Sequence, residues 1–546
     1  MKEKRRKKPL NYLKGLRAML AILFFAPVLL YFVDFAGALP ENVHGLLHLQ
    51  LVPAALGGMI GIIVLMFALA FVFGRIYCSV ICPAGILQDI INRVFCIKRK
   101  KQKGVMRFKY RKPMNMFRYA LLTLTVASAL FGATTLLLKL DPYSNFGRIA
   151  SNLFRPLVMW GNNAAFHALE ALDNHSLYPV TVKTVTTAGW AAAAIALLTF
   201  IAMTIWRGRL FCNSLCPVGA VLSIVSRYSL FRISFDAERC NSCGSCERSC
   251  KAEAVDSKRM KVDTSLCVLC FNCTSTCPKA SLKYRFAPAF PLAQPELNVA
   301  EASHTKGTVN STTSSRRKFF ATGATIAATL PMISSLARKH QEAAATSTVA
   351  FDSTKDAVDY NNLGPVTPPG SMDLERFKDK CTACHICITR CPTQVLRPAG
   401  LEYGFDYMLR PHCAFVSSYC NYDCTVCSEV CPSHAIGGLS IEEKHTTQVG
   451  IATFNLNRCV VYTNETDCGA CAEHCPTRAV HMVHYKGILT IPQVEPELCI
   501  GCGGCESICP VRPLRAIVVV AHKTHVKVAA PEEEEVEKIE NNEFAF

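Results

Sequence analysis

The feature that most constrains this chain is a cysteine spacing, C-x2-C-x2-C-x3-C, that recurs along its 546 residues. It occurs twice in succession mid-chain, at Cys240, Cys243, Cys246 and Cys250 and then at Cys267, Cys270, Cys273 and Cys277. In iron-sulfur proteins with this run, three cysteines of one motif and the fourth of the other bind each [4Fe-4S] cluster. The spacing therefore predicts one cluster on Cys240, Cys243, Cys246 and Cys277, and a second on Cys267, Cys270, Cys273 and Cys250.

Four further cysteine groups, each ending in Cys-Pro, follow in the last third of the chain. Three of them are Cys381, Cys384, Cys387 and Cys391; Cys459, Cys468, Cys471 and Cys475, with an enlarged first gap; and Cys499, Cys502, Cys505 and Cys509. The remaining group has five members, Cys413, Cys420, Cys424, Cys427 and Cys431, and Cys420 fits the spacing better than its alternate Cys413. Six motifs predict six [4Fe-4S] clusters in two ferredoxin-like α+β modules, residues 231–285 and 373–525.

Two other uses of cysteine are disfavoured by the same spacing. A zinc site normally takes two separated C-x2-C knuckles for one ion, which these runs do not provide. Disulfides are common in exported domains, but four ligand-spaced motifs ending in Cys-Pro argue against them.

Apolar segments dominate the first 230 residues, where we expect a membrane domain. Half of the chain is hydrophobic and its mean hydropathy is +0.22. Four uncharged or nearly uncharged runs are long enough to cross a bilayer. These runs are Ala18 to Leu39, Leu51 to Phe73, Tyr119 to Leu138 and Thr184 to Trp206. They predict about four transmembrane helices.

The positive charge of the chain, formally +18, gathers beside these runs and indicates orientation rather than nucleic-acid binding. The N-terminus is basic, and so is the segment from Lys98 to Arg118, whereas the loop from Gly37 to Gln50 has neither Lys nor Arg. The N-terminus and the first ferredoxin-like module should therefore lie in the cytoplasm, with the protein in a bacterial inner (plasma) membrane.

The two modules are joined by a linker, residues 286–315, and a segment at 316–338 that begins with Arg316 and Arg317. A twin arginine before a mildly apolar stretch is typical of an export signal for folded proteins, and it is equally the basic flank of a membrane anchor. Both interpretations put a second linker, 339–372, and the C-terminal module in the periplasm. Residues 526–546 form an acidic tail.

Four cysteines outside the ferredoxin motifs form two C-x3-C-P pairs, Cys78 with Cys82 and Cys212 with Cys216, just after two of the apolar runs. We hypothesise a shared metal centre or a redox-active thiol group there. The alternative is a pair of structural turns capped by proline. His44 and His48 either face a quinol headgroup or are simply interfacial, and Cys96 has no motif around it.

The segments FGRIYCSVICPAG and WRGRLFCNSLCPVGA, followed by the two-cluster run, resemble the NapH family, the membrane iron-sulfur subunit of a quinol dehydrogenase. The chain from Ser315 resembles the exported NapG family in its twin arginine, in VTPPGS before the first motif, and in the order of four motifs with a lengthened third. The resemblance implies a polyferredoxin that takes electrons from menaquinol or ubiquinol and passes them, often through a cytochrome, to periplasmic nitrate reductase. Fusion into one chain departs from the two-subunit arrangement.

The sequence thus predicts a membrane-bound electron-transfer component, with menaquinone as a possible second cofactor. Its expected partners are the membrane quinone pool and an extracytoplasmic reductase or cytochrome, and no nucleic acid. No residue is predicted to perform substrate chemistry beyond electron transfer, because the clusters supply the redox chemistry. The alternatives are a metallocentre-assembly or copper-handling factor resembling the CcoG family, which shares the C-x3-C-P design, and a redox sensor.

Overall fold

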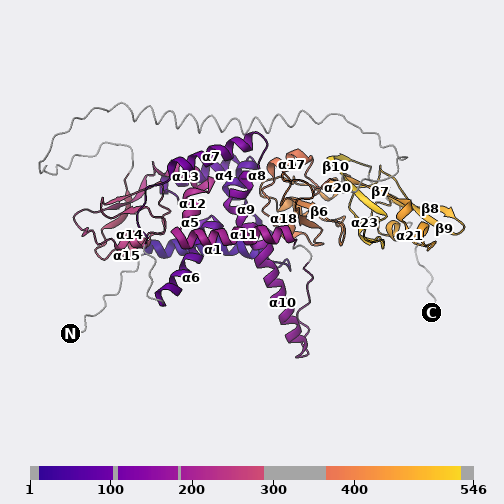
Figure 1. Ribbon diagram of the computed structural model, residues 1–546, viewed down its shortest axis with the longest axis horizontal. Helices are drawn as coiled ribbons and strands as arrows, with labels where there is room; N and C mark the ends of the chain where they lie inside the picture. The colour runs from indigo at the N-terminus through magenta and orange to yellow at the C-terminus, as the bar shows by residue number, and fades with distance from the viewer. Residues whose placement is uncertain (1–11, 102–107, 183–185, 288–363, 530–546) are drawn as a thin grey trace, which may run out of the picture. The chain divides into compact units, whose positions relative to one another are not determined.

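The computed structural model describes residues 12–101, 108–182, 186–287 and 364–529 (Figure 1). The twin arginine at Arg316 and Arg317, most of both linkers and most of the acidic tail lie outside these ranges. The chain forms two compact units. The first comprises residues 1–31, 38–150 and 193–355, and the second comprises residues 32–37, 151–192 and 356–546. The region expected to be one membrane domain, 1–230, therefore contributes residues 32–37 and 151–192 to the unit that carries the C-terminal module.

The helical half contains one long helix near each end and shorter helices between them. Its elements in order are α1 (Tyr12–Val33), η1 (Glu41–His44), α2 (Gly45–His48), α3 (Leu51–Leu56), α4 (Ile60–Phe73), α5 (Tyr77–Val80), α6 (Pro83–Lys101), α7 (Asn115–Leu130), α8 (Thr135–Leu140), α9 (Pro142–Ile149), η2 (Ala150–Phe154), α10 (Arg155–Glu170), α11 (Thr187–Arg207), α12 (Leu210–Ser214) and α13 (Pro217–Ser226). Proline at the first position of α6 and α13 suits a helix start, where its missing N–H has no intrahelical partner.

Two of these helices, α1 and α11, are long and apolar enough to cross a membrane. Both leave large apolar side chains on the surface; Ile22 of α1 and Ile195 of α11, for example, are 66% and 65% exposed. The expected span Leu51 to Phe73 is not one helix, because Gly58 adopts φ +74° and separates α3 from the 14-residue α4. The expected span Tyr119 to Leu138 is likewise broken at Gly132, with φ +80°, between α7 and α8.

The first ferredoxin-like module folds as a strand, a cysteine motif, a short hairpin, a second motif and a closing strand. Its elements are β1 (Phe231–Phe235), α14 (Ser245–Ser249), β2 (Val255–Asp256), β3 (Lys261–Val262), α15 (Asn272–Thr276) and β4 (Leu282–Phe286). The first and last strands pair antiparallel, with Phe231 opposite Phe286, and β2 pairs with β3. This pairing closes the chain on itself and brings the two motifs together.

The C-terminal module repeats that order at its end. Its elements are α17 (Leu374–Lys380), α18 (Ile386–Arg390), β5 (Leu396–Pro398), β6 (Pro411–Cys413), α19 (Val426–Glu429), α20 (Ile441–His445), β7 (Thr447–Phe454), η3 (Leu456–Arg458), α21 (Val460–Thr463), α22 (Ala470–Glu473), β8 (Val480–Lys486), β9 (Leu489–Val494), α23 (Gly504–Ile508) and β10 (Ile517–Lys527). Strands β7 and β10 pair antiparallel around the last two motifs, and β8 and β9 form the hairpin between them (Figure 1). The third and fourth motifs of the chain are joined instead through the short pair β5 and β6.

Candidate iron-sulfur and thiol sites

In each of the six cysteine motifs a loop leads into a helix of four or five residues that carries the third cysteine. These helices are α14 with Cys246, α15 with Cys273, α18 with Cys387, α19 with Cys427, α22 with Cys471 and α23 with Cys505. They contact one another in consecutive pairs, α14 with α15, α18 with α19 and α22 with α23. The six motifs are thus arranged as three two-motif pairs.

A left-handed residue just before the helix makes the loop tight in four of the six motifs. Gly244 and Gly503 adopt φ of 69° and 77°, and Phe271 and His385 adopt 55° and 66°. At Gly503 a β-carbon would collide with the Phe415 ring, so glycine is needed there for space as well as for conformation.

In the first module the structure brings together cysteines from both motifs. Cys273 interacts electrostatically with Cys250, Cys270 and Cys267, and Cys246 interacts with Cys277 and Cys243. The fourth cysteine of each motif therefore lies with the first three of the other. This is the crossed arrangement that two-cluster ferredoxins use.

The same crossing recurs twice in the C-terminal module. The electrostatic neighbours define four sets: Cys381, Cys384 and Cys387 with Cys431; Cys420, Cys424 and Cys427 with Cys391; Cys459, Cys468 and Cys471 with Cys509; and Cys499, Cys502 and Cys505 with Cys475. We call them the Cys381, Cys420, Cys459 and Cys499 groups. Cys413, expected to be surplus, is buried beside Cys420, Cys427 and Cys391, so five thiols surround the Cys420 group.

The four groups follow one another in space in an order that differs from their order in the sequence. Cys387 of the first group interacts with Cys427 of the Cys420 group. The Cys420 amide donates a hydrogen bond of 2.9 Å to the carbonyl oxygen of Cys502, which joins the Cys420 group to the Cys499 group. Cys505 of the Cys499 group in turn interacts with Cys471. The Cys459 group, third in sequence, is therefore the terminal member of the series.

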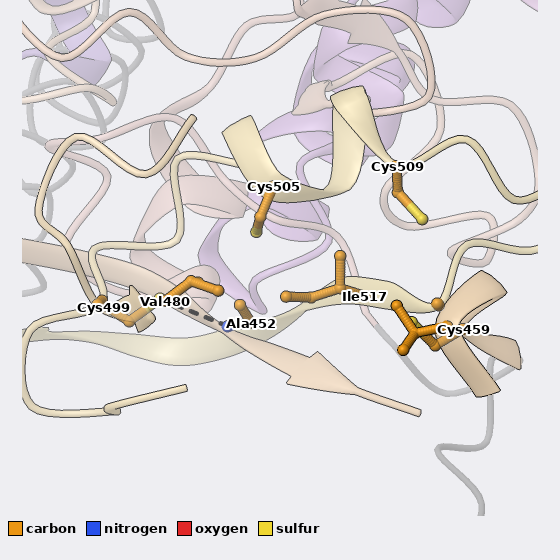
Figure 2. Close-up of a cluster of buried hydrophobic side chains, with 10 residues drawn as sticks. Ala452, Cys459, Val480, Cys499, Cys505, Cys509 and Ile517 are labelled. Atoms are coloured by element: carbon orange, nitrogen blue, oxygen red, sulfur yellow. Dashed lines mark hydrogen bonds between the residues drawn. The ribbon is translucent and has the colours of Figure 1, made fainter. Parts of the chain in front are cut away.

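A cavity at that terminal group shows whether its residues suit a cluster. It is lined by Cys459, Cys468, Cys471 and Cys509 together with apolar side chains such as Ile517. Figure 2 shows several of these residues in the apolar core formed with Val480 and Ala452. Four thiols from two motifs facing an apolar cavity match the donor set of a [4Fe-4S] cluster. Among the described residues, no three His, Cys, Asp or Glu side chains lie close enough together to bind a single metal ion.

Backbone amides also donate to the cysteine sulfurs. Examples are Ala254 to Cys250 at 3.4 Å, Ala383 to Cys381 at 3.4 Å and, dashed in Figure 2, Ala452 to Cys499 at 3.5 Å. Burial raises the pKa of the Cys250 and Cys384 thiols to about 12, so that without a bound metal both are neutral at pH 7. A cluster bound there would displace those protons, and the N–H···S bonds would help to set its potential.

A buried lysine distinguishes the Cys420 group. Lys444 in α20 is 3% exposed, and its ammonium donates to the carbonyl oxygens of Asn421 and, at 2.6 Å, Cys424. It also interacts with Cys420, Cys413 and Cys427. In the described part of the chain no carboxylate pairs with it, so its charge acts on the thiols. The lysine lies in a segment without a cysteine motif, and nothing in the spacing pointed to it.

The two C-x3-C-P pairs come together in the first unit, and all four thiols are buried. Cys216 interacts electrostatically with Cys212, Cys82 and Cys78. Cys78 lies in α5 and Cys212 in α12, whereas Cys82 and Cys216 immediately precede α6 and α13. The structure thus gathers the four cysteines of the hypothesis, which we call the thiol quartet.

Charged side chains that the spacing did not reveal surround the quartet. Asp89 pairs with Arg209 at 2.6 Å, with Lys251 at 2.6 Å and with Arg17 at 3.0 Å. These cations, Arg209 and Lys251 first, hold the pKa of Asp89 well below its usual range although burial opposes them. Lys251 stands where a proline usually follows the motif, and its ion pair with Asp89 explains the departure. The signal available in the sequence was the arginine three residues before the first cysteine in both pairs.

The two histidines near the second apolar segment are close to each other, with ring centroids 6.0 Å apart for His44 and His48. The side chain of Cys96 lies outside the described residues.

Crossed groups of four cysteines on short helices define a 4Fe-4S ferredoxin-type electron-transfer protein, and comparison with known sequences agrees. A family model described as a 4Fe-4S dicluster domain matches residues 465–512. Another, described as a 4Fe-4S binding domain, matches residues 53–104 and 188–236, the two segments that contain the thiol quartet.

Among curated proteins, the chain is homologous to the ferredoxin-type protein NapF of Escherichia coli, with 27% identity over 29% of this chain and 87% of NapF. It is also similar to the methylamine utilization ferredoxin-type protein MauN of Paracoccus denitrificans, with 26% identity over 40% of this chain and 64% of MauN. An uncharacterised protein of Methanocaldococcus jannaschii is 27% identical over 40% of this chain and 66% of its own length. The chain thus spans less than two thirds of the last two relatives. No solved structure matches.

Proposed function

We propose that this protein is a membrane-bound quinol dehydrogenase component that carries electrons from menaquinol through [4Fe-4S] clusters to an extracytoplasmic reductase, such as periplasmic nitrate reductase. The observation that carries the proposal is the continuous series of four crossed cysteine groups in the C-terminal module. A series of redox centres with a beginning and an end is what one-electron relay requires, and the clusters themselves perform the chemistry.

The series also suggests a direction. His385, inside the first motif of the C-terminal module, accepts a 2.9 Å hydrogen bond at Nδ1 from the side-chain amide of Asn152 in η2. Both residues belong to the unit that includes the first turn of apolar α11. The Cys381 group is therefore the end of the series that adjoins the helical segment. We infer that electrons enter at this group and leave at the Cys459 group.

Membrane attachment is supported by the large apolar side chains that α1 and α11 leave exposed, since large exposed apolar patches mark a membrane or a partner. The charge asymmetry of the sequence supports a cytoplasmic N-terminus and first module, and the twin arginine supports a periplasmic C-terminal module. The resemblance to fused NapH-type and NapG-type subunits supports the same assignment. Each oxidised quinol would release two electrons into the clusters and two protons.

Quinol-dependent cluster reduction in anaerobic membrane vesicles tests the proposal. Adding a reduced menaquinone analogue should bleach the cluster absorbance near 400 nm, roughly the region of sulfur-to-iron charge transfer, and generate the EPR signals of reduced clusters. Vesicles carrying the chain with Cys509→Ala should still show bleaching, because electrons enter at the other end of the series. Clusters that stay oxidised when quinol is added, but are reduced by dithionite, would contradict the quinol assignment.

A further inference from the structure

We propose that the thiol quartet, Cys78, Cys82, Cys212 and Cys216, binds one additional [4Fe-4S] cluster shared between the two halves of an internal repeat. This centre goes beyond the six clusters of the ferredoxin motifs. It does not depend on quinol being the electron donor. The family model that matches these two segments names the cluster class but no ligands.

The two halves repeat a twelve-residue pattern with the same local structure. Residues 74–85 read GRIYCSVICPAG and residues 208–219 read GRLFCNSLCPVG. Both begin with a glycine in the left-handed region, at φ 85° for Gly74 and 66° for Gly208, and both continue through a one-turn helix into a longer helix that starts at the proline. The final glycines, Gly85 and Gly219, are needed for close packing, because a β-carbon there would collide with the carbonyl oxygen of Cys78 or Cys212.

The arginines of the repeat lock the halves together by reciprocal hydrogen bonds. Arg75 of the first half donates to the carbonyl oxygen of Cys212 at 3.1 Å, and Arg209 of the second half donates to that of Cys78 at 2.6 Å. Each half therefore positions the first cysteine of the other. Such an exchange fixes the four thiols as one group and not as two independent pairs.

Donors are also directed at the sulfurs themselves. The amide of Gly219 donates to Cys216 Sγ at 3.3 Å, and the Gln88 side-chain amide donates to Cys212 Sγ at 3.4 Å. A guanidinium nitrogen of Arg75 lies 3.9 Å from Cys78 Sγ. Hydrogen bonds of this kind favour a metal-bound thiolate over a neutral thiol, since the charged sulfur is the stronger acceptor.

The charge around the quartet favours a negative group at its centre. Arg75 and Arg118 are 0% and 1% exposed, and in the described ranges neither pairs with a carboxylate. Arg118 donates to the Gly219 carbonyl oxygen at 2.7 Å and interacts electrostatically with Cys78 and Cys216. The third buried arginine, Arg209, shares Asp89 with two further cations. Buried cations without anions are strongly unfavourable. Four cysteine thiolates on a dicationic [4Fe-4S] core carry a net negative charge that would offset them.

The quartet also adjoins the first ferredoxin module. Arg75 donates to the Ser265 carbonyl oxygen at 2.9 Å and interacts with Cys267, two residues further on. A cluster on the quartet would therefore be the neighbour of the cluster on Cys267, Cys270, Cys273 and Cys250. This places the additional centre at the start of a second series, which continues to the cluster predicted on Cys240, Cys243, Cys246 and Cys277.

Iron and acid-labile sulfide analysis of the full-length chain, purified anaerobically in detergent, tests the site. The variants are Cys78→Ala with Cys82→Ala, Cys212→Ala with Cys216→Ala, and all four changes together. Because the cluster is shared, each double variant and the quadruple variant should lose the same amount, about four irons and four sulfides per chain. Cys96→Ala is the control that should lose none, and Cys509→Ala calibrates the loss of one ferredoxin cluster.

Unchanged iron in the double variants would overturn the proposal, and so would loss of a single iron without sulfide. A quadruple variant that loses twice as much as either double would overturn the sharing. Arg75→Gln keeps every cysteine and covers the case of poor folding. It should lower the reduction potential of the EPR-detected centre that the quadruple variant lacks, and an unaltered potential of that centre would count against the site. These readouts do not involve quinol, so they can fail or succeed independently of the function proposed above.

Discussion

Lys444 offers the most direct test of how the protein sets the potential of one cluster. Its ammonium is buried, it donates to backbone carbonyls around the Cys420 group, and no described carboxylate neutralises it. Adding an electron to that cluster makes it more negative, so the lysine stabilises the reduced form. Replacing Lys444 by Met keeps most of the side-chain volume but removes the charge. The reduction potential of this cluster should therefore fall.

The size of the fall follows from the geometry. The ammonium lies 2.6 Å from the carbonyl oxygen of Cys424, a ligand candidate. We take about 6 Å as the order of magnitude of its separation from the charge of a bound cluster. At that distance a unit charge contributes about 3 kcal/mol with an effective dielectric constant of about 20, and about half of that with a value near 40. For a one-electron couple these energies correspond to a decrease of about 60 to 120 mV.

The measurement is an EPR-monitored redox titration of the full-length chain with and without Lys444→Met. Lys486→Met is the matched control, because Lys486 is in the same module but forms an exposed pair with Glu465. One cluster should shift in the first variant and none in the control. Equal potentials in Lys444→Met and the unmodified chain would refute the electrostatic reasoning, and a fall in iron content would show that the lysine holds the loop instead of tuning the cluster.

Three further outcomes are expected. Asp89→Asn leaves three partly or fully buried cations without their anion. In denaturant unfolding it should destabilise the N-terminal unit by about 3–5 kcal/mol. The control Arg259→Gln, which removes an exposed ion pair, should cost less than about 1 kcal/mol. Burial, and then the neighbouring His522, lower the pKa of His525 to about 4, although Asp373 opposes the shift. As the pH falls, this histidine therefore binds a proton in the unfolded chain before it does so in the folded chain. Stability of the C-terminal unit should therefore decline between about pH 6.5 and 4, by up to about 3 kcal/mol, and this part of the decline should vanish in His525→Gln. Cys468→Ala and Cys509→Ala should abolish the same EPR signal although they belong to different motifs; loss of two different signals would contradict the crossed grouping.

Local features of the sites could be predicted from the sequence because they are set over a few residues. The cysteine spacing determines which three side chains converge on one loop, and the crossed fourth ligand follows from pairing two such loops. The lengths of the helices could not be read from hydropathy alone. The run from Leu51 to Phe73 is uniformly apolar, yet a left-handed glycine at position 58 ends one helix before the next begins.

Long-range contacts explain what the spacing could not show. Lys444 and Arg118 reach their sites from segments without any cysteine motif, and Lys251 finds its partner in Asp89, far away in sequence. Cys413 was expected to be surplus because it fits the spacing less well than Cys420, but strand β6 brings it beside the same group. Buried charge and strand pairing decide these positions, and neither has a local sequence signature.

The order of the groups has a consequence for where the electron acceptor binds. The backbone hydrogen bond between Cys420 and Cys502 places the Cys499 group next to the Cys420 group, which leaves the Cys459 group at the end of the series. That group is the one with the enlarged gap between its first two cysteines, and the inserted residues include the exposed side chain of Tyr462. The adjoining β8–β9 hairpin carries Ile488 at its tip, 93% exposed. If electrons leave at the Cys459 group, as proposed above, the acceptor approaches these exposed side chains. Substitutions there, and not around the Cys381 group, should then weaken electron delivery while leaving cluster reduction by the donor intact.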